Sequence, residues 1–360
     1  MIRKYSMKRM KMERYTELHL HLDGSLPIQT VRKLMKMNNI YPEGYSSEEE
    51  IGDDLLKELL MVSPDCRDLN EYLKKFDFPL LLLQNRESLK AAVFELGIWL
   101  QEQNVGYAEI RFAPQLHTRR CLTQREVADA AIEGIREYRA AGGAAELRLI
   151  FCLMRGDMGD AEKYEMNMET VRIASEIFET YSSGKHISGD SASPDPFPSA
   201  ADTRGVLAGL DLAGAEALFP TKDYRPFFSV AHEKGIPFTI HAGEAAGPES
   251  VWEAIDMGAK RIGHGIAAAR DEKLMRYMAG HGIVVEMCPT SNLQTGAVRD
   301  IRDYPLRTFL EYGIPVTVNS DNCTVSGTTI KEEFELLRKE IGLTRDEEER
   351  IRNYATICIA

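Results

Sequence analysis

The chain has 360 residues, of which 44% are hydrophobic and 28% are charged, so it can bury a sizeable core. One large domain suits this length as well as two smaller ones. The formal net charge of −12 argues against general affinity for nucleic acid or an anionic membrane, because both would repel an acidic surface. A small-molecule substrate is therefore the better expectation.

The beginning of the chain is basic, with six Lys or Arg side chains in the first fifteen residues. No apolar stretch of the kind that a secretory signal needs follows them, so we interpret residues 1–15 as a solvated tail and residues 16–360 as a single domain. Six cysteines are scattered without a C-x-x-C pair, which fits reduced thiols better than a disulfide framework. No apolar run reaches the length of a membrane span. Together these features predict a cytoplasmic protein.

Short apolar runs alternate with longer segments of helical periodicity. The runs predict eight strands, at residues 16–22, 107–112, 147–153, 206–212, 237–241, 261–265, 283–288 and 315–319. Segments with apolar residues at helical spacing lie between them, at 86–103, 124–141, 162–180 and 249–257. Eight strand-and-helix units predict an α/β fold, the parallel (β/α)₈ or TIM barrel, whose chemistry lies at the C-terminal ends of the strands.

Two stretches are longer than this repeat requires. Residues 27–84 separate the first two strands and include the apolar segment 76–83, so we expect a helical insertion that caps the active site. That segment fits a lid over a ligand as well as an ordinary buried helix face. Residues 182–204, rich in Ser, Gly, Asp and Pro, predict a long mobile loop. Met154 and Arg155 end the third strand, where both could face the pocket, but we prefer a core methionine and a surface arginine.

Five polar residues lie at or just beyond the end of a short apolar run: His19, His21, His241, His264 and Asp321. On an extended strand the imidazoles of His19 and His21 leave the same face, and such a pair can hold one cation. The predicted ligand set has three nitrogens and one oxygen: His19, His21, His241 and Asp321. Zinc suits this set best, although the sequence leaves iron and cobalt open. For His264, which lies between two glycines, we prefer the role of orienting a water molecule to that of a fifth ligand.

Six short blocks, in this order over roughly residues 16–330, resemble the signature of the adenosine deaminase family. They are HLHLDGSL at 19–26, DLAG at 211–214, HAGE at 241–244, RIGHG at 261–265, CPTSN at 288–292 and SDN at 320–322. A single H-x-H pair is weak support for a family, but six blocks in order are highly specific.

The resemblance implies a barrel enzyme that uses one zinc ion to hydrolyse the exocyclic amine of adenosine, and of 2′-deoxyadenosine, to give inosine and ammonia in purine metabolism. It implies that the four residues named above bind zinc and that Asp211 and Ser291 support the site. Glu244 would protonate purine N1, and His264 would orient the attacking hydroxide. The implied substrate contacts are His21, Asp23, Gly214 and Asn322, with Asp23 at the ribose 5′-hydroxyl and the Gly214 backbone amide at purine N3.

One position departs from the family pattern, because many members carry a second aspartate where this chain has Asn322. An asparagine can still donate a hydrogen bond to purine N7 through its amide. Two alternatives stay open: a deaminase of the same family that acts on adenine, an adenine nucleotide or a modified adenine nucleoside, and a non-catalytic member that keeps the zinc. We rank a nucleoside substrate above a nucleotide because no Lys or Arg cluster lies beside the six blocks.

Overall fold

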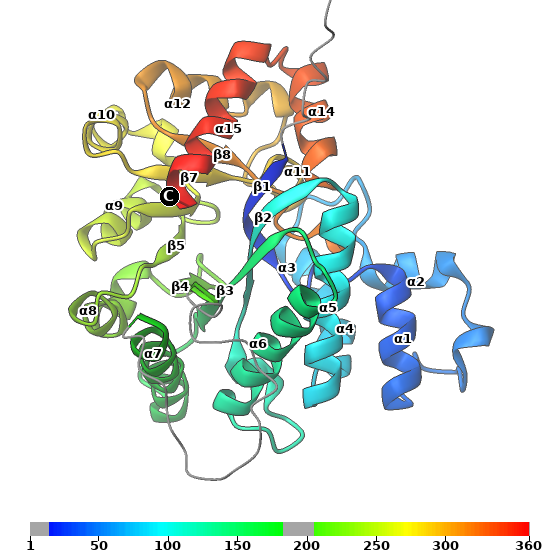
Figure 1. Cartoon of the computed structure of the whole chain (residues 1–360). Helices are drawn as coiled ribbons and strands as arrows, with labels where there is room; N and C mark the ends of the chain where they lie inside the picture. The colour runs from blue at the N-terminus through cyan, green and yellow to red at the C-terminus, as the bar shows by residue number, and fades with distance from the viewer. Residues whose placement is uncertain (1–13, 183–204, 360) are drawn as a thin grey trace, which may run out of the picture.

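The computed structural model describes residues 14–182 and 205–359. In this part of the chain eight parallel strands form a closed barrel (Figure 1). They are β1 (Tyr15–His21), β2 (Val105–Phe112), β3 (Glu146–Met154), β4 (Leu207–Ala213), β5 (Thr239–Ala242), β6 (Arg261–His264), β7 (Val284–Met287) and β8 (Val316–Val318). The pairing runs from β1 to β4 and from β5 to β8. Isolated parallel bridges, Leu210 with Phe238 and Leu20 with Asp321, join the two halves.

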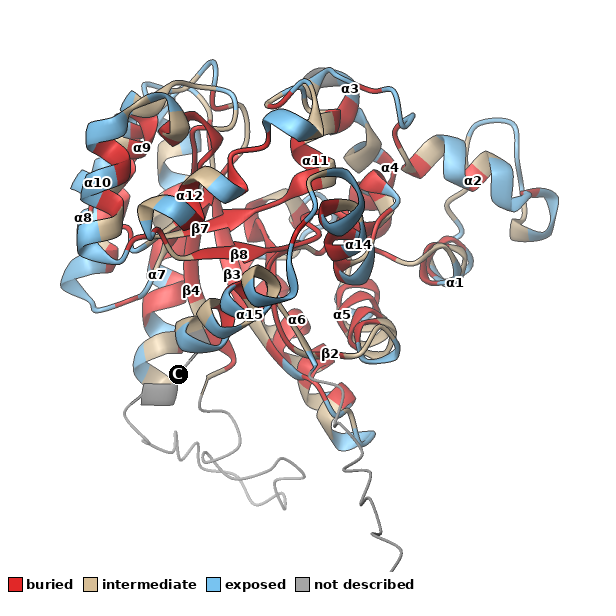
Figure 2. Ribbon diagram, turned by 90° about the horizontal axis from the view of Figure 1, so that it is seen from above, coloured by how far each residue is buried: buried red, intermediate tan, exposed pale blue. Residues whose placement is uncertain are grey.

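Amphipathic helices cover the outside of the barrel. They are α5 (Arg86–Glu102), α6 (Gln124–Ala140), α7 (Ala161–Ser182), α8 (Arg225–Glu233), α9 (Pro248–Asp256), α10 (Glu272–His281), α12 (Leu306–Tyr312) and α14 (Ile330–Glu340). Figure 2 shows the strands as buried, whereas helices such as α9, α10 and α12 keep an exposed outer face. Local signals define their ends: Thr123 and Glu126 form a capping box at α6, and Gly282 ends α10 in the left-handed conformation.

Shorter elements complete the barrel. Two short helices follow β7 and β8 directly, α11 (Pro289–Gln294) and α13 (Cys323–Ser326), and the last helix, α15 (Arg345–Ile359), packs against β1 and β8. The 3-10 helices outside the insertion are η3 (Pro114–His117), η4 (Thr221–Tyr224), η5 (Ile266–Arg270) and η6 (Ile301–Asp303).

The long connection between β1 and β2 is a helical insertion that precedes α5. It contains α1 (Ile28–Asn38), η1 (Glu48–Glu50), α2 (Asp53–Leu60), α3 (Leu69–Leu73), η2 (Lys74–Phe76) and α4 (Asp77–Leu82). In Figure 1 α1 and α2 stand at the right-hand side of the barrel. The segment from α3 to α4 lies at the barrel mouth, because Leu69, Phe76 and Leu80 all line the pocket there.

The predicted barrel and its capping insertion are confirmed. All eight predicted strands overlap an observed one, because parallel strands buried on both faces read as apolar runs in the sequence. β1 begins at Tyr15, within the predicted basic tail; residues 1–13 of that tail and residues 183–204 of the predicted loop lie outside the described residues. None of the described helices is long and apolar enough to cross a lipid bilayer.

Candidate active site

The predicted site residues come together in one pocket at the C-terminal ends of the strands. His21 ends β1, His241 lies in β5 and His264 ends β6, whereas Asp321 follows β8. These four line the pocket, and His19 lies beneath it, fully buried. His264 and Asp321 have φ angles of 62° and 61°, in the left-handed region that costs energy for residues other than glycine. The strain at both positions is typical of residues held for function.

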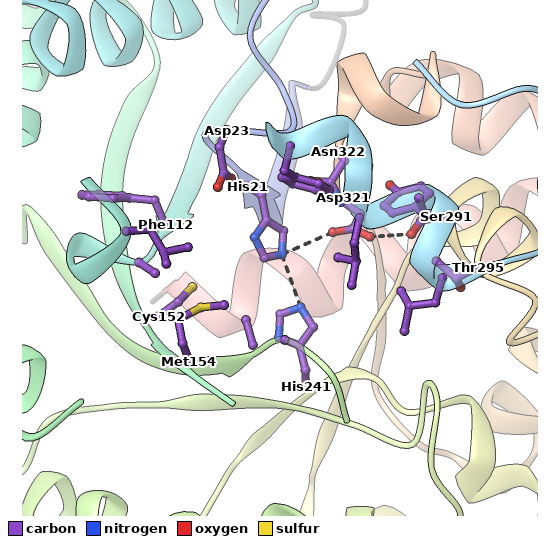
Figure 3. Close-up of a pocket in the computed structure, with 18 of the residues that line it drawn as sticks. His21, Asp23, Phe112, Cys152, Met154, His241, Ser291, Thr295, Asp321 and Asn322 are labelled. Atoms are coloured by element: carbon purple, nitrogen blue, oxygen red, sulfur yellow. Dashed lines mark hydrogen bonds and ion pairs between the residues drawn. The ribbon is translucent and has the colours of Figure 1, made fainter. Parts of the chain in front are cut away.

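The ligand atoms of four side chains lie close together, those of His19, His21, His241 and Asp321. Figure 3 shows three of these side chains, His21, His241 and Asp321. Nε2 of His241 lies 3.0 Å from Nε2 of His19 and 3.3 Å from Nε2 of His21. Oδ1 of Asp321 lies 3.4 Å from Nε2 of each of these two histidines. Tetrahedral ligands about 2.0 Å from a zinc ion would be about 3.3 Å apart. The observed spacings therefore match those of ligands around a single metal ion.

The carboxylates on the far side of two rings indicate which ring nitrogen is free. His19 Nδ1 lies 2.9 Å from Glu286, and His241 Nδ1 lies 2.8 Å from Asp211. A carboxylate only accepts, so each Nδ1 carries a hydrogen, and in the neutral ring Nε2 then presents its lone pair. Burial lowers the pKa of the His19 ring to about 4, which keeps it neutral. When both rings are neutral, their two Nε2 lone pairs, 3.0 Å apart, repel each other unless a cation lies between them.

The buried polar atoms around this cluster also fit a metal ion. Among the described residues, Oδ1 of Asp321 has no hydrogen-bond partner. Ring nitrogens of His19, His241 and His264 lie within 4.8 Å of one another, and so do ligand atoms of His19, Cys288 and Asp321. The cluster can therefore hold a metal ion.

His264 differs from the other histidines in its hydrogen bonding. Its Nδ1 lies 3.0 Å from the amide nitrogen of Asn292, which can only donate, so Nδ1 accepts and the neutral ring carries its hydrogen on Nε2. The hydroxyl of Tyr304 donates to Oδ1 of Asn292 over 3.1 Å and so orients that amide. Nε2 of His264 faces Glu244, whose Oε2 is 3.6 Å away. An Nε2 that carries a hydrogen cannot bind a metal. His264 therefore differs from His19 and His241, whose Nε2 atoms can act as ligands.

A buried network of charges supports two of the rings from below. Arg111 joins Asp211 over 2.8 Å and Glu286 over 2.9 Å, and these are the carboxylates behind His241 and His19. Burial alone would raise the pKa of Glu286, but Arg261 and Arg111 hold it well below its ordinary value. The carboxylates are therefore ionised acceptors, and the network determines the orientation of both rings.

Sequence reasoning missed most of this network. Glu286 and Arg111 had no place in it, Asn292 appeared only within a family block, and Asp211 was expected to support the site without a named partner. The available signal was a charged residue inside an otherwise apolar strand, as at Arg111 in β2 and Glu286 in β7. A charge that is buried there needs a partner across the barrel. The partner itself depends on which strands face each other.

The pocket has a polar side and an apolar side. The polar side carries the histidines, Asp23, Glu244, Ser291, Asp321 and Asn322, while the apolar side comes from the insertion and from β2 and β3. Leu69, Tyr72 and Leu80 of the insertion line it, which favours the lid interpretation over a helix face buried in the core. The described lining residues include no Lys or Arg.

Two further expectations concern the end of β3. Met154 lines the pocket rather than lying wholly in the core. The prediction of a surface arginine at Arg155 is wrong: this side chain is buried, and it donates hydrogen bonds to the carbonyl of His241 over 2.6 Å and to Thr221 over 2.9 Å. Arg155 thus fixes the backbone at the end of β5, a role that its position after a strand could not reveal.

The residues expected to contact the substrate also line the pocket. Asp23 is buried, its Oδ1 has no partner among the described residues, and burial raises its pKa to about 6. Oδ1 of Asn322 likewise has no partner within the described residues. Gly214 has φ +105° and borders the pocket at the end of β4, where a side chain would be strained. These groups are available to a ligand.

Comparison with known proteins agrees with the fold and the site. A family model for adenosine deaminase matches residues 15–202 and 199–357. An adenosine deaminase from Haemophilus ducreyi is 41% identical over 335 residues, which is 93% of this chain and 88% of that protein.

Solved structures share the architecture at lower sequence identity. An adenine deaminase from Arthrobacter aurescens has a TM-score of 0.75 at 22% identity, covering 96% of this chain and 93% of that one. An amidohydrolase from Burkholderia ambifaria with bound zinc has a TM-score of 0.73 at 18% identity, covering 96% and 85%. At such identities these two similarities show the fold.

Proposed function

This chain belongs to the adenosine deaminase family, and from that premise we propose that it hydrolyses adenosine, and 2′-deoxyadenosine, to inosine or 2′-deoxyinosine and ammonia. Water adds at C6 of the purine and the amine leaves. The observation that carries the proposal is the buried cluster of His19, His21, His241 and Asp321, whose free ligand atoms converge beside Glu244 in a pocket.

We propose that these four residues hold one zinc ion. Three imidazole nitrogens and one carboxylate oxygen are a ligand set that zinc accepts. When bound, zinc lowers the pKa of a coordinated water to about 7 and so supplies a nucleophile at neutral pH. Glu286 and Asp211 keep the ligand nitrogens of His19 and His241 free and correctly oriented.

Glu244 is the proposed proton donor. Purine C6 is a poor electrophile because the ring is rich in electrons, and a proton delivered to N1 makes C6 more susceptible to attack. Glu244 follows β5, lines the pocket and lies on the same side as the ligand cluster. His264 presents Nε2–H toward this space, so it acts as a hydrogen-bond donor that orients the attacking water, not as its base.

The proposed substrate contacts distinguish a nucleoside from a nucleotide. Asn322 would donate to N7, the backbone amide of Gly214 would meet N3, and Asp23 would accept from the ribose 5′-hydroxyl. His21 would contact the substrate as well as the metal. A 5′-phosphate would stand near the carboxylate of Asp23, and the described lining offers no Lys or Arg to neutralise it. A neutral 5′-hydroxyl suits this end of the pocket.

We also propose a cytoplasmic location and a single catalytic domain at residues 16–360, preceded by the basic tail. All six cysteines are free, which supports a reducing compartment. Cell fractionation tests the location, and limited proteolysis tests whether residues 16–360 resist cleavage as one unit.

The first test of the function is ammonia release from adenosine, 2′-deoxyadenosine, adenine and AMP, each with zinc-loaded and metal-stripped protein. Zinc-dependent release from the two nucleosides, with little from adenine or AMP, is the expected result. Faster release from adenine or AMP would replace the substrate assignment while keeping the reaction. No release from any of the four would contradict the proposal, as would full activity of the stripped protein.

A further inference from the structure

The short helix α11, with its C-cap Thr295, reaches three parts of the site at once. Its side chains make the following hydrogen bonds: Ser291 Oγ to Asp321 Oδ2 (2.5 Å), Asn292 Nδ2 to His264 Nδ1 (3.0 Å) and Thr295 Oγ1 to Glu244 Oε1 (3.1 Å). Ser291 and Thr295 are four residues apart and so lie on one face of the helix. One element thus contacts a proposed metal ligand, the histidine and the acid.

The Glu244 carboxyl has few other restraints. Its Oε2 is 3.6 Å from Nε2 of His264, which is too far for a good hydrogen bond. Among the described residues, Thr295 is the one that donates a hydrogen bond to this carboxyl. A second hollow, lined in part by Gly247 and Arg270, shares Glu244 and Thr295 with the main pocket. Glu244 therefore has space on two sides, and the hydrogen bond from Thr295 restrains its position.

Thr295 is itself held rigidly. Its backbone N–H donates to the carbonyl of Ser291 over 2.8 Å at the end of α11. A β-branched side chain has few χ1 choices, so the backbone position limits where the hydroxyl can lie. The hydroxyl can therefore restrict the Glu244 side chain in a way that a flexible partner could not.

We propose that Thr295 is a positioning residue for Glu244, an inference that rests on the proposed role of Glu244 as the acid. By occupying Oε1, the Thr295 hydroxyl leaves Oε2 to carry the proton that is delivered to purine N1. After transfer the O–H bond of Oε2 is broken, an N–H bond has formed on the ring, and the carboxylate is negative. The hydrogen bond from Thr295 strengthens as that charge develops, so it stabilises the transition state more than the ground state.

The test compares Thr295→Val, which removes the hydroxyl at nearly constant shape, with Thr295→Ser, which keeps it. We expect kcat for adenosine to fall about 10- to 100-fold in the valine variant, the range for losing one hydrogen bond to a charged group. KM and zinc content should stay within about twofold of the wild type, and serine should restore most of the rate. Thr356→Val, the same change on the exposed face of α15, is the control and should have no effect.

Three results would overturn the inference. They are full kcat in Thr295→Val, equal losses of kcat in the valine and serine variants, or a raised KM with unchanged kcat, which would make Thr295 a substrate contact. A double-mutant cycle adds a fourth criterion, because a residue that acts only through Glu244 should have no effect once Glu244→Gln is present. A further drop in the residual rate on adding Thr295→Val would contradict this.

The same set of proteins separates failure of this inference from failure of the proposed function. If Glu244→Gln is inactive while Thr295→Val is normal, Glu244 keeps its role and the tether is wrong. If Glu244→Gln turns over adenosine at the wild-type rate, the assignment of the acid fails first.

Discussion

Gly24 provides the space that Asn322 occupies: a Cβ added at Gly24 would lie 1.9 Å from Oδ1 of Asn322. The carbonyl of Gly24 accepts hydrogen bonds from the backbone N–H groups of Thr324 and Val325, at 3.0 and 3.1 Å. The turn after β1 and the segment after β8 are therefore packed directly together. A glycine in the first block of the sequence thus determines where a side chain of the last block can lie.

Gly24→Ala should displace the Asn322 side chain from the pocket. We expect KM for adenosine to rise about tenfold, the cost of one lost hydrogen bond, and stability to fall by about 1–3 kcal/mol from overpacking. Zinc content should not change. Gly52→Ala is the control, since a Cβ there meets nothing within 4 Å. Steady-state kinetics with metal analysis checks the prediction, and an unchanged KM in Gly24→Ala would show that Asn322 does not contact the substrate.

Asn322→Asp should change substrate affinity more than metal content. An aspartate accepts hydrogen bonds but donates one only when protonated, so its contact with an acceptor such as N7 becomes dependent on a proton. We expect KM to become pH-dependent while bound zinc stays at the wild-type level. Comparable losses of zinc and of substrate affinity would instead mark position 322 as structural.

Glu244→Gln should retain zinc and lose turnover, because glutamine keeps the shape and the acceptor oxygen but has no acidic proton. General acid catalysis contributes about 10²- to 10⁴-fold, and kcat should fall by that factor. Glu249→Gln, an exposed position five residues further along, is the matched control and should behave as the wild type. Near-normal kcat in Glu244→Gln would refute the assigned role.

His117 should make the protein less stable as the pH falls. The ring is buried, its Nδ1 bonds to the carbonyl of Leu83, and burial lowers its pKa from 6.5 to about 4. The unfolded chain therefore takes up the proton first, so stability is complete above pH 6.5 and is lost as the pH falls toward 4. This group alone should lower the free energy of unfolding by about 2 kcal/mol between pH 7 and pH 5.

Urea unfolding at both pH values measures that difference. His117→Gln should reduce the pH-dependent loss by about 2 kcal/mol relative to the wild type, whatever its effect at pH 7. The same loss in both proteins would mean that other groups, such as His19 and His21, account for the acid sensitivity.

Most of the barrel could be predicted because its strands are buried on both faces and its helices are amphipathic, and both patterns are local. Whether part of the insertion covers the pocket as a lid could not be predicted in this way. The apolar segment at 76–83 fits a buried helix face as well as a ligand-facing one, and only the position of α3 and α4 over the pocket distinguishes the two. Arg155 was misjudged for a similar reason, since its partners, Thr221 and the His241 carbonyl, lie on other strand-and-helix units.

The sequence by itself determined the fold class, the positions of the strands and the polar residues at their ends, because each depends on neighbouring residues along the chain. The tertiary structure alone decided which carboxylates stand behind His19 and His241, which ring nitrogen of these two histidines is therefore free, and which hydroxyl holds Glu244. These relations join residues on different strands, up to 267 positions apart in the pair His19 and Glu286. They follow from strand order and register around the closed barrel, which no local pattern encodes.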